Sequence, residues 1–350
     1  MGIVISLLVL SGLIFFHELG HYLAARLMGV YVEVFSIGFG KKLVTFRRFN
    51  TDWTISAIPL GGYVKMKGQD DSDPTKKSPD NDSYNVKTPV QKIFILLAGP
   101  AFNFIIAFFL YLAIALGSPQ ILSPVIGTVV KDSPAFIAGL ESNDTITSIN
   151  AVKVETWKEM AEIIKTSRGS LDMGILRNGF FEYKILTPQL NEAKNMFGET
   201  VERKMIGISS AGVTHPLDLS VGETFGYAWE QTIFASTMIF TGVQKLITGD
   251  VPAKELGGVI SIVKLTSDAS EQGWMSVLFF AALISVNLGV LNLLPIPALD
   301  GGHIMFNLYE LIFRREASEA VMMKFTIAGW VILFGLMGLG LFNDITRLVG

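Results

Sequence analysis

The pentapeptide HELGH at residues 17–21 lies inside a long apolar segment, and this combination constrains the chain more than any other feature. Residues 3–16 read IVISLLVLSGLIFF, and beyond the pentapeptide no further charge occurs until Arg26. An apolar segment of this length predicts a membrane-spanning helix. Two imidazoles and a carboxylate are costly in hydrocarbon, so a span that carries them is expected to use them.

The spacing of these polar residues is H-E-x-x-H. In a helix, His17 and His21 are four residues apart and project from one face, where they offer two nitrogen ligands to one metal ion. Glu18 lies beside them as a candidate general base. The alternative is that all three are polar packing groups. Their place within an apolar span favours the metal site, and zinc is the ion we expect.

The composition indicates an integral membrane protein with a soluble portion, because half of the 350 residues are hydrophobic. Cysteine is absent, so metal ligands must come from histidine, aspartate or glutamate. The net charge is -3, and no basic patch with interleaved aromatic residues occurs. We therefore expect no nucleic-acid partner.

Four apolar segments are long enough to cross the hydrocarbon core of a bilayer. We expect the first to remain uncleaved, because neither a basic region before it nor a small-residue cleavage site accompanies it. The predicted spans are residues 1–28, which carry the H-E-x-x-H motif, 93–117, 274–303, which carry the N-x-x-P-x-P-x-L-D-G-G motif, and 326–345.

The distribution of basic residues predicts the orientation of these spans. Lysines and arginines follow the first span and lie between the third and fourth, whereas none precedes the first. The positive-inside rule then places both of these loops, including a predicted cytoplasmic loop over residues 304–325, on the cytoplasmic side. Residues 117–274 and both termini are expected to face outward.

Residues 29–67 alternate apolar and polar side chains in short runs that are punctuated by glycine. This pattern is typical of strands and predicts a β-hairpin that re-enters the membrane toward the metal site. Backbone at that depth is tolerated only where protein buries it or water reaches it. The alternative is a plain cytoplasmic hairpin. Residues 68–92 are polar and are predicted to form a linker.

Residues 122–212 are predicted to form a small α+β domain between the second and third spans. Residues 125–130 read as a strand and residues 157–166 as a short amphipathic helix. The order SPAxxAGLxxxDxIxxIN, which starts at Ser133, resembles the PDZ domains of bacterial envelope proteases. Such a domain takes up an extended peptide as an added strand. The alternative is a spacer that only limits access to the membrane.

Residues 213–273 connect this domain to the third span. Their helical periodicity and their aromatic residues predict an amphipathic connector at the outer membrane interface. Packing against the spans is the alternative.

The third metal ligand is expected near the end of the third span, where residues 292–303 read NLLPIPALDGGH. Asp300 is the only charged residue between Glu271 and Glu310. The paired prolines break the helix there, so a carboxylate can be presented at membrane depth. We therefore favour Asp300 as the third ligand. His303 is the alternative, either as a ligand or as a partner that orients one.

The two motifs together resemble the site-2 protease family of intramembrane zinc metalloproteases. The single PDZ-like insert, the GFG sequence at residues 38–40 and the order of the four spans resemble its bacterial regulator-of-sigma-E protease branch. The resemblance covers almost the whole chain. One departure is that the best-known Gram-negative members carry tandem PDZ domains, whereas this sequence shows one.

This resemblance implies roles for particular residues. His17, His21 and Asp300 match the zinc ligands of the family, and Glu18 matches its general base. Asn292 matches an asparagine that holds the substrate backbone. The loop after the first span matches a membrane-reentrant β-loop, in which Gly38, Phe39 and Gly40 are candidates for substrate binding by strand addition.

The expected fold is therefore an α-helical membrane protein with four transmembrane helices, a membrane-associated β-hairpin loop and an inserted α+β PDZ domain. The resemblance implies a bacterial cytoplasmic (inner) membrane enzyme with the PDZ domain on the outer side. Its expected partners are membrane lipid and single-span proteins, such as trimmed anti-sigma factors or signal-peptide remnants. A catalytically inert PDZ adapter is the alternative. A transporter is disfavoured, because the spans show no further charges and no inverted repeat.

Overall fold

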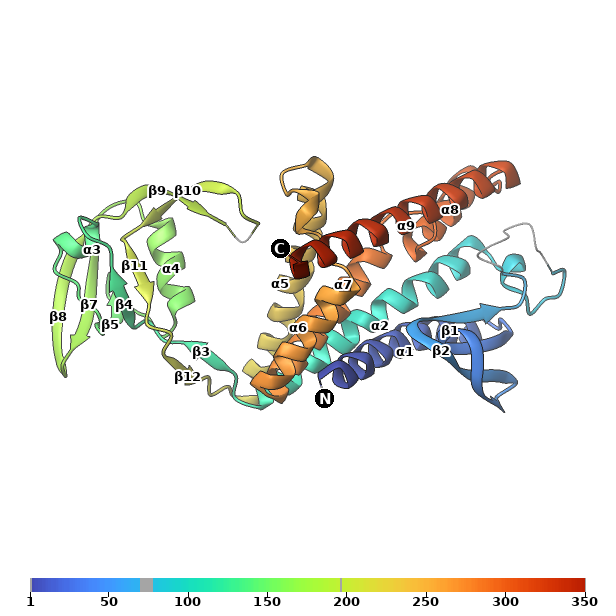
Figure 1. The fold of residues 1–350 in the computed structure, drawn as a ribbon, viewed down its shortest axis with the longest axis horizontal. Coiled ribbons are helices and arrows are strands. Elements are labelled where there is room, and N and C mark those ends of the chain that lie inside the picture. The colour runs from blue at the N-terminus through green and yellow to red at the C-terminus, as the bar shows by residue number, and fades with distance from the viewer. Residues whose placement is uncertain (1, 70–77, 196, 350) are drawn as a thin grey trace. The chain divides into compact units, whose positions relative to one another are not determined.

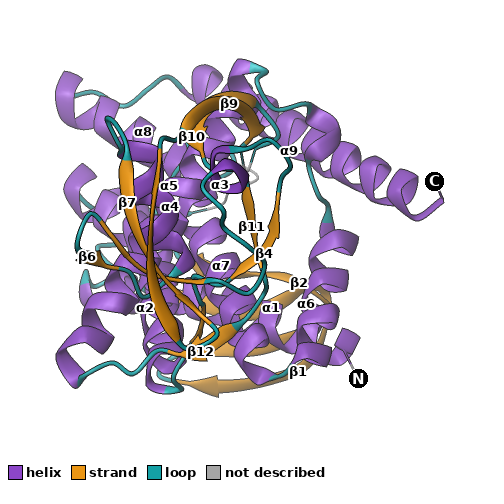
Figure 2. Cartoon of the chain, turned by 90° about the vertical axis from the view of Figure 1, so that its left-hand side faces the viewer, coloured by secondary structure: helices purple, strands orange, loops and turns teal. Residues whose placement is uncertain are grey.

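The computed structural model describes residues 2–69, 78–195 and 197–349, which fall into two compact units (Figure 1). The first unit contains the two ends of the chain, Met1–Ala115 and Val221–Gly350, and the second is Leu116–Ser220. The first unit is mostly helical, whereas the second is mixed α and β (Figure 2). Part of the predicted polar linker, residues 70–77, lies outside the described residues.

Four helices of the first unit are long and apolar enough to cross a membrane, which supports the predicted multi-pass helical membrane protein. Helix α2 (Pro89–Leu116) begins four residues earlier than predicted. The Thr88 hydroxyl accepts from the Gln91 backbone N–H, and Pro89 suits the first helical position. These helices are α1 (Gly2–Leu27), α2 (Pro89–Leu116), α7 (Trp274–Asn292) and α9 (Glu319–Val349).

The region between α7 and α9 differs from the prediction. The segment predicted as a loop, residues 304–325, is mostly helical, because helix α8 (Asp300–Phe313) occupies its first half and α9 begins at Glu319, whereas its cytoplasmic side stays a prediction. The chain breaks after α7, where Pro295 and Pro297 cannot continue a helix, and becomes helical again at Asp300. The basic residues in this region bear on membrane sidedness and carry no information about its conformation.

The connector forms two helices, α5 (Val221–Thr248) and α6 (Val259–Gln272), besides the short 3-10 helix η2 (Ala253–Glu255). Helix α5 buries Ala228 and Ala235 among residues of α2 and α7, which agrees with packing against the spans for this face. Helix α6 lies along α1, where the Ser6 hydroxyl donates to the Val263 carbonyl over 3.0 Å. Both helices therefore belong to the helical bundle.

Two long strands follow α1, in the segment where alternation predicted strands: β1 (Val32–Arg48) and β2 (Thr51–Met66). They pair twice, because Val34 lies opposite both Lys65 and Asp52. Residues 34–37 thus have residues 62–65 on one side and residues 52–55 on the other, while residues 42–48 pair with residues 51–56. The result is a compact layer that packs on the second half of α1.

The second unit is built around an antiparallel sheet in the order β6-β5-β7-β8. Helix α4 covers Trp157–Thr166, the range predicted from sequence, and a capping box of Thr156 and Glu159 fixes its start. The other elements are η1 (Tyr84–Val86) in the first unit and, in the second, β3 (Gln120–Leu122), β4 (Ile126–Val129), α3 (Pro134–Ile137), β5 (Thr145–Ile149), β6 (Val152–Lys153), β7 (Leu171–Arg177), β8 (Phe180–Leu186), β9 (Gln189–Lys194), β10 (Thr200–Met205), β11 (Ile208–Ser210) and β12 (Thr214–Pro216).

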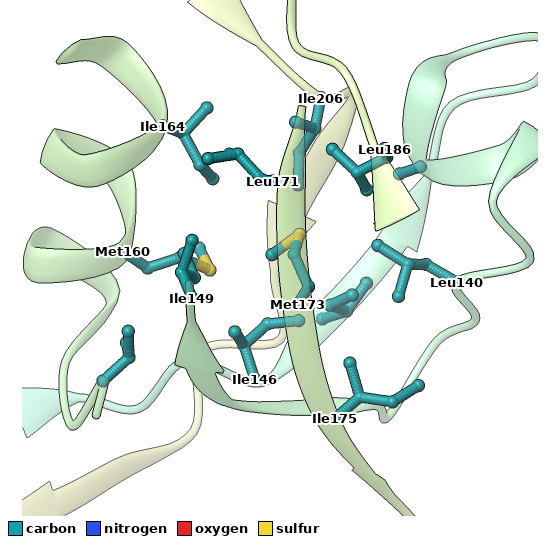
Figure 3. Packing of buried hydrophobic residues seen from close by; sticks show 13 residues of the cluster. Leu140, Ile146, Ile149, Met160, Ile164, Leu171, Met173, Ile175, Leu186 and Ile206 are labelled. Carbon is teal, nitrogen blue, oxygen red and sulfur yellow. The ribbon is translucent and has the colours of Figure 1, made fainter. Parts of the chain in front are cut away.

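The core of the second unit is a cluster of buried aliphatic side chains and methionines (Figure 3). Ile146 and Ile149 from β5 and Met173 from β7 pack against Met160 and Ile164 of α4. This core lies wholly within residues 126–206. The second unit therefore has its own hydrophobic core, as expected of a domain inserted between two spans.

A buried ion pair fastens the turn after α3 to strand β7. The Arg177 guanidinium donates to both carboxylate oxygens of Asp144 over 2.7 Å, and also to Glu141 and the Gly139 carbonyl. Burial alone would raise the pKa of the Asp144 carboxyl, but hydrogen bonds from Arg177 and the Glu141 backbone N–H outweigh it and hold this pKa below its ordinary value. The ionised carboxylate is therefore part of the folded state.

We predict that Asp144→Asn lowers the free energy of unfolding of the second unit by about 3 kcal/mol, because Arg177 loses its buried counter-charge. In the native protein this stabilisation is present above the unfolded pKa of about 3.9 and is lost as the pH falls through the lower folded pKa. Hydrogen exchange of peptides from β5 and β7 measures both effects. Protection that is equal in the variant and the native protein at pH 7 would contradict the assignment.

Candidate metal centre

The two histidines of the HELGH motif lie one turn apart on α1, and their rings meet at one point. His21 is buried, and its Nδ1 lies 2.9 Å from the carbonyl oxygen of Ile95 on α2. Because a carbonyl only accepts, Nδ1 carries the proton and the lone pair of Nε2 is free. The Nε2 atoms of His17 and His21 lie 3.2 Å apart. The ring of His21 is thus oriented for coordination through Nε2.

Asp300 completes a triangle of possible ligand atoms. Its Oδ2 lies 3.4 Å from Nε2 of His17 and 3.4 Å from Nε2 of His21. This oxygen is buried and has no hydrogen-bond partner. A tetrahedral ion with bonds of about 2.0–2.1 Å holds its ligands about 3.3 Å apart, which matches all three sides. The residues present therefore fit a tetrahedral divalent metal with one position left open.

Close packing of α1 on α2 brings the histidines to their partners. A Cβ on Gly20 would collide with the Ala98 carbonyl, and a Cβ on Gly99 would collide with the ring of His21. Two glycines therefore allow the helices to approach so closely that an imidazole lies directly on a backbone. This contact places the Ile95 carbonyl within reach of His21.

Asp300 is positioned by the break after α7. A Cβ on Gly301 or Gly302 would collide with carbonyl groups of residues 293–296, so the first turn of α8 folds tightly against that break. Ala298 has a φ of +86°, a left-handed conformation that non-glycine residues seldom adopt. Gly329 of α9 packs on the Pro297 carbonyl from the other side. The geometry of the third candidate ligand thus depends on several close backbone contacts.

Glu18 follows His17 and packs against the β-layer. A Cβ on Gly62 would lie 3.1 Å from Cγ of Glu18 and 2.8 Å from the Ser36 carbonyl oxygen. Gly62 belongs to residues 62–65 of β2, which pair with residues 34–37 of β1. The candidate general base is therefore enclosed between its own helix and a strand of this layer.

The remaining predicted residues lie at different places. Asn292 is the last residue of α7. Its side-chain amide lies beside the triangle, with Nδ2 3.3 Å from Nε2 of His17. Gly38 and Gly40 have φ values of +87° and +83° at the bend of β1. The half-exposed ring of Phe39 covers Gly61 and stacks on Tyr63 with centroids 6.1 Å apart. The metal-ligating cluster found among the described residues does not include His303.

Comparison with known proteins identifies the family. A family profile described as "Peptidase family M50" matches residues 5–336. The chain belongs to peptidase family M50. This is the site-2 protease family that the two sequence motifs resemble.

Relatives in several bacteria match the M50 chain over almost its whole length, and each is named "Putative zinc metalloprotease". One from Campylobacter jejuni is 47% identical over 345 residues, covering 99% of this chain and 93% of the relative. One from Helicobacter pylori strain J99 is 42% identical over 355 residues, with 99% of both chains covered. One from Clostridium acetobutylicum is 33% identical over 337 residues, covering 96% and 95%.

The structure adds a site residue that the sequence analysis missed. Asn103 of α2 is fully buried, and its side-chain amide lies 3.0 Å from Nδ1 of His17. Its Oδ1 has no hydrogen-bond partner. Turning the amide over brings Oδ1 to the Nδ1–H of His17, so that both groups are satisfied and Nε2 is left for the metal. The sequence signal that could have found this residue is the amide of Asn103 within the uncharged predicted span over residues 93–117.

We predict that Asn103→Leu raises the dissociation constant for zinc about 10- to 100-fold, because His17 loses the group that orients its ring. Asn307→Leu is the matched control, since among the described residues the amide of this buried asparagine donates only to the His303 carbonyl of its own helix. Zinc competition with a fluorescent chelator measures both variants. Equal affinity in Asn103→Leu and the native protein would refute the orienting role.

Proposed function

We propose that this M50 chain is a zinc metalloprotease of the site-2 type, which hydrolyses peptide bonds in or near the membrane segment of single-span proteins. The observation that carries the proposal is the ligand triangle with sides of 3.2, 3.4 and 3.4 Å. Its nitrogen atoms come from a candidate membrane span, and its carboxylate follows another at the break after α7. Because such polar groups are costly within a membrane, we infer that they are present to bind a catalytic metal ion.

Zinc is the metal that we assign to the site. The relatives are named for zinc, and two imidazoles with one carboxylate form a ligand set of catalytic zinc sites. When bound, zinc would polarise the scissile carbonyl and lower the pKa of a water molecule toward ~7. His17, His21 and Asp300 would hold it.

The residues of this chain then supply proton transfer and positioning. Glu18 accepts a proton from the attacking water as its oxygen bonds to the carbonyl carbon. The same carboxyl gives the proton to the amine nitrogen as the C–N bond breaks. The amide of Asn292 lies beside the triangle and donates to the substrate backbone or to the developing oxyanion.

A helical substrate hides its amides in hydrogen bonds of its own, so it has to be unwound before hydrolysis. Residues 62–65 of β2 pair with residues 34–37 on one side, and Gly62 lies against Glu18. We propose that an extended substrate segment adds along this run, because strand addition replaces the lost hydrogen bonds. Gly38, Phe39 and Gly40 border the same layer and are proposed to shape the substrate surface.

The second unit is proposed to be a PDZ domain that faces the outer side of a bacterial cytoplasmic membrane. Support comes from its SPAxxAGLxxxDxIxxIN sequence, its separate core and its insertion between two candidate spans. We propose that it binds a peptide end. The β-layer is proposed to re-enter the membrane, and the chain is proposed to be of the regulator-of-sigma-E type. Its proposed substrates are trimmed anti-sigma factors or signal-peptide remnants.

Glu18→Gln tests the proposed chemistry. We expect the variant to retain zinc and to lose at least about 10²-fold in the cleavage rate of a single-span reporter, because the amide cannot accept the proton. Glu271→Gln at the exposed end of α6 is the matched control and is expected to cleave normally. Reporter cleavage by Glu18→Gln at the native rate would reject the assignment of Glu18. A native protein that bound zinc but failed to cleave the reporter would favour the inert adapter.

Gly62→Ala tests the contact between β2 and the general base. The added methyl group would collide with Ile14 and the Ser36 carbonyl and would press on Cγ of Glu18. Because this displaces the candidate general base, we expect kcat to fall about 10²-fold. Gly12→Ala is the matched control, because a Cβ there has no neighbour within 4 Å. Reporter cleavage in detergent measures both variants. Similar rates for the two would show that the close approach at Gly62 is unimportant.

A further inference from the structure

A buried ion pair joins helix α8 to helix α2. Nζ of Lys92 lies 3.2 Å from Oε2 of Glu310, and their side chains are only 8% and 21% exposed. Lys92 is the only charged residue of α2, and Glu310 is the only carboxylate of α8 besides Asp300. Two charges at low exposure are unfavourable unless each satisfies the other, so the pair specifies one placement of the two helices.

Helix α8 is held at its start by the backbone contacts of Gly301 and Gly302, and further along by the ring of Phe306 against Phe325 of α9 with centroids 5.3 Å apart, but its polar contacts with other helices are few. Asp300 stands at its first residue, and Glu310 lies ten residues later, about 15 Å along the helix axis. Its remaining buried polar side chain, Asn307, donates to the His303 carbonyl of the same helix. Leu308, Leu311 and Ile312 are exposed. Among the described residues, Glu310 therefore makes the one side-chain hydrogen bond or ion pair from α8 to another helix apart from those of Asp300.

The same end of α2 orients one of the histidines. Lys92 precedes Ile95 by three residues, so both lie on one turn, and the Ile95 carbonyl accepts from His21. A shift of α8 relative to this turn would displace Asp300 relative to Nε2 of His21. The ion pair and the histidine contact thus position Asp300 and the ring of His21 relative to the same short segment of α2.

We propose that Lys92 and Glu310 are positioning residues: their ion pair fixes α8 against α2 and thereby holds Asp300 at the His17–His21 pair. This proposal rests on the proposed metal site. Neither residue touches the ligand triangle, so the pair acts through the placement of α8. An ion pair suits this task because a displacement of α8 that separated the two charges would leave both of them unpaired at low exposure.

Distance measurements test this placement directly. The chain contains no cysteine, so spin labels at Val90→Cys on α2 and Leu311→Cys on α8, two exposed positions, report one distance distribution without background. The doubly labelled protein is compared with three variants that carry the same labels. They are Glu310→Gln, the double variant Lys92→Met/Glu310→Gln, which leaves no unpaired charge, and the exchanged pair Lys92→Glu/Glu310→Lys. Glu271→Gln is the control. Each protein is measured without metal in lipid nanodiscs.

We expect Glu310→Gln and the double variant to broaden or shift the distribution and to weaken zinc binding about tenfold, as loss of a supporting contact does at metal sites. The exchanged pair is expected to restore the distribution and to bring zinc affinity within about threefold of the native value. The control is expected to change neither quantity. In the cleavage assay the loss should appear in kcat, because the substrate surface is untouched.

Two results would overturn the proposal. The first is a native distance distribution in the double variant, even if zinc affinity falls, because the effect would then not act through α8. The second is a changed distribution with native zinc affinity. If the native protein bound no zinc, the proposed function would fail, whereas the metal-free distances would still show whether the ion pair places α8.

Discussion

Two candidate ligand atoms from one turn of α1 and a third from Asp300, almost 280 residues later, have to meet within 3.4 Å inside a membrane protein, and this requirement governs the rest of the structure. An imidazole can present Nε2 to a metal only if Nδ1 has an acceptor, because the proton has to lie on one nitrogen or the other. For His21 the acceptor is the Ile95 carbonyl, and for His17 it is the Asn103 Oδ1 once that side-chain amide is turned over. Helix α2 contributes none of the candidate metal ligands, yet it contacts Nδ1 of both rings.

Small residues and a broken helix provide the space for this arrangement. Gly20 and Gly99 let α1 and α2 approach until a side chain of one lies on the backbone of the other. At the third candidate ligand, Gly301 and Gly302 fold α8 onto the break that follows α7. Irregular backbone is unfavourable in hydrocarbon unless protein covers it, and here α9 covers the break at Gly329. Chemistry and packing therefore use the same few positions.

The second unit shows how an insertion can leave such a site intact. Its aliphatic core, its capping box and the Asp144–Arg177 pair are all internal to residues 116–220. It needs nothing from the membrane unit to form its core, so the chain can combine two kinds of packing. The membrane unit instead exposes large apolar side chains on its long helices, as a protein surrounded by lipid does.

The sequence alone determined the spacing of His17 and His21 and the four apolar helices, and it favoured Asp300 over His303 as the third candidate ligand, because helix period, hydropathy and isolated charge are local properties of a chain. It did not predict helix α8, because the basic residues of the segment indicated only its side of the membrane and not its conformation. The partners of the imidazoles, the contact of Gly62 with Glu18 and the Lys92–Glu310 pair were decided only by tertiary structure. Each joins residues 44 to 218 positions apart, and which faces meet over such a separation depends on how whole helices and strands pack.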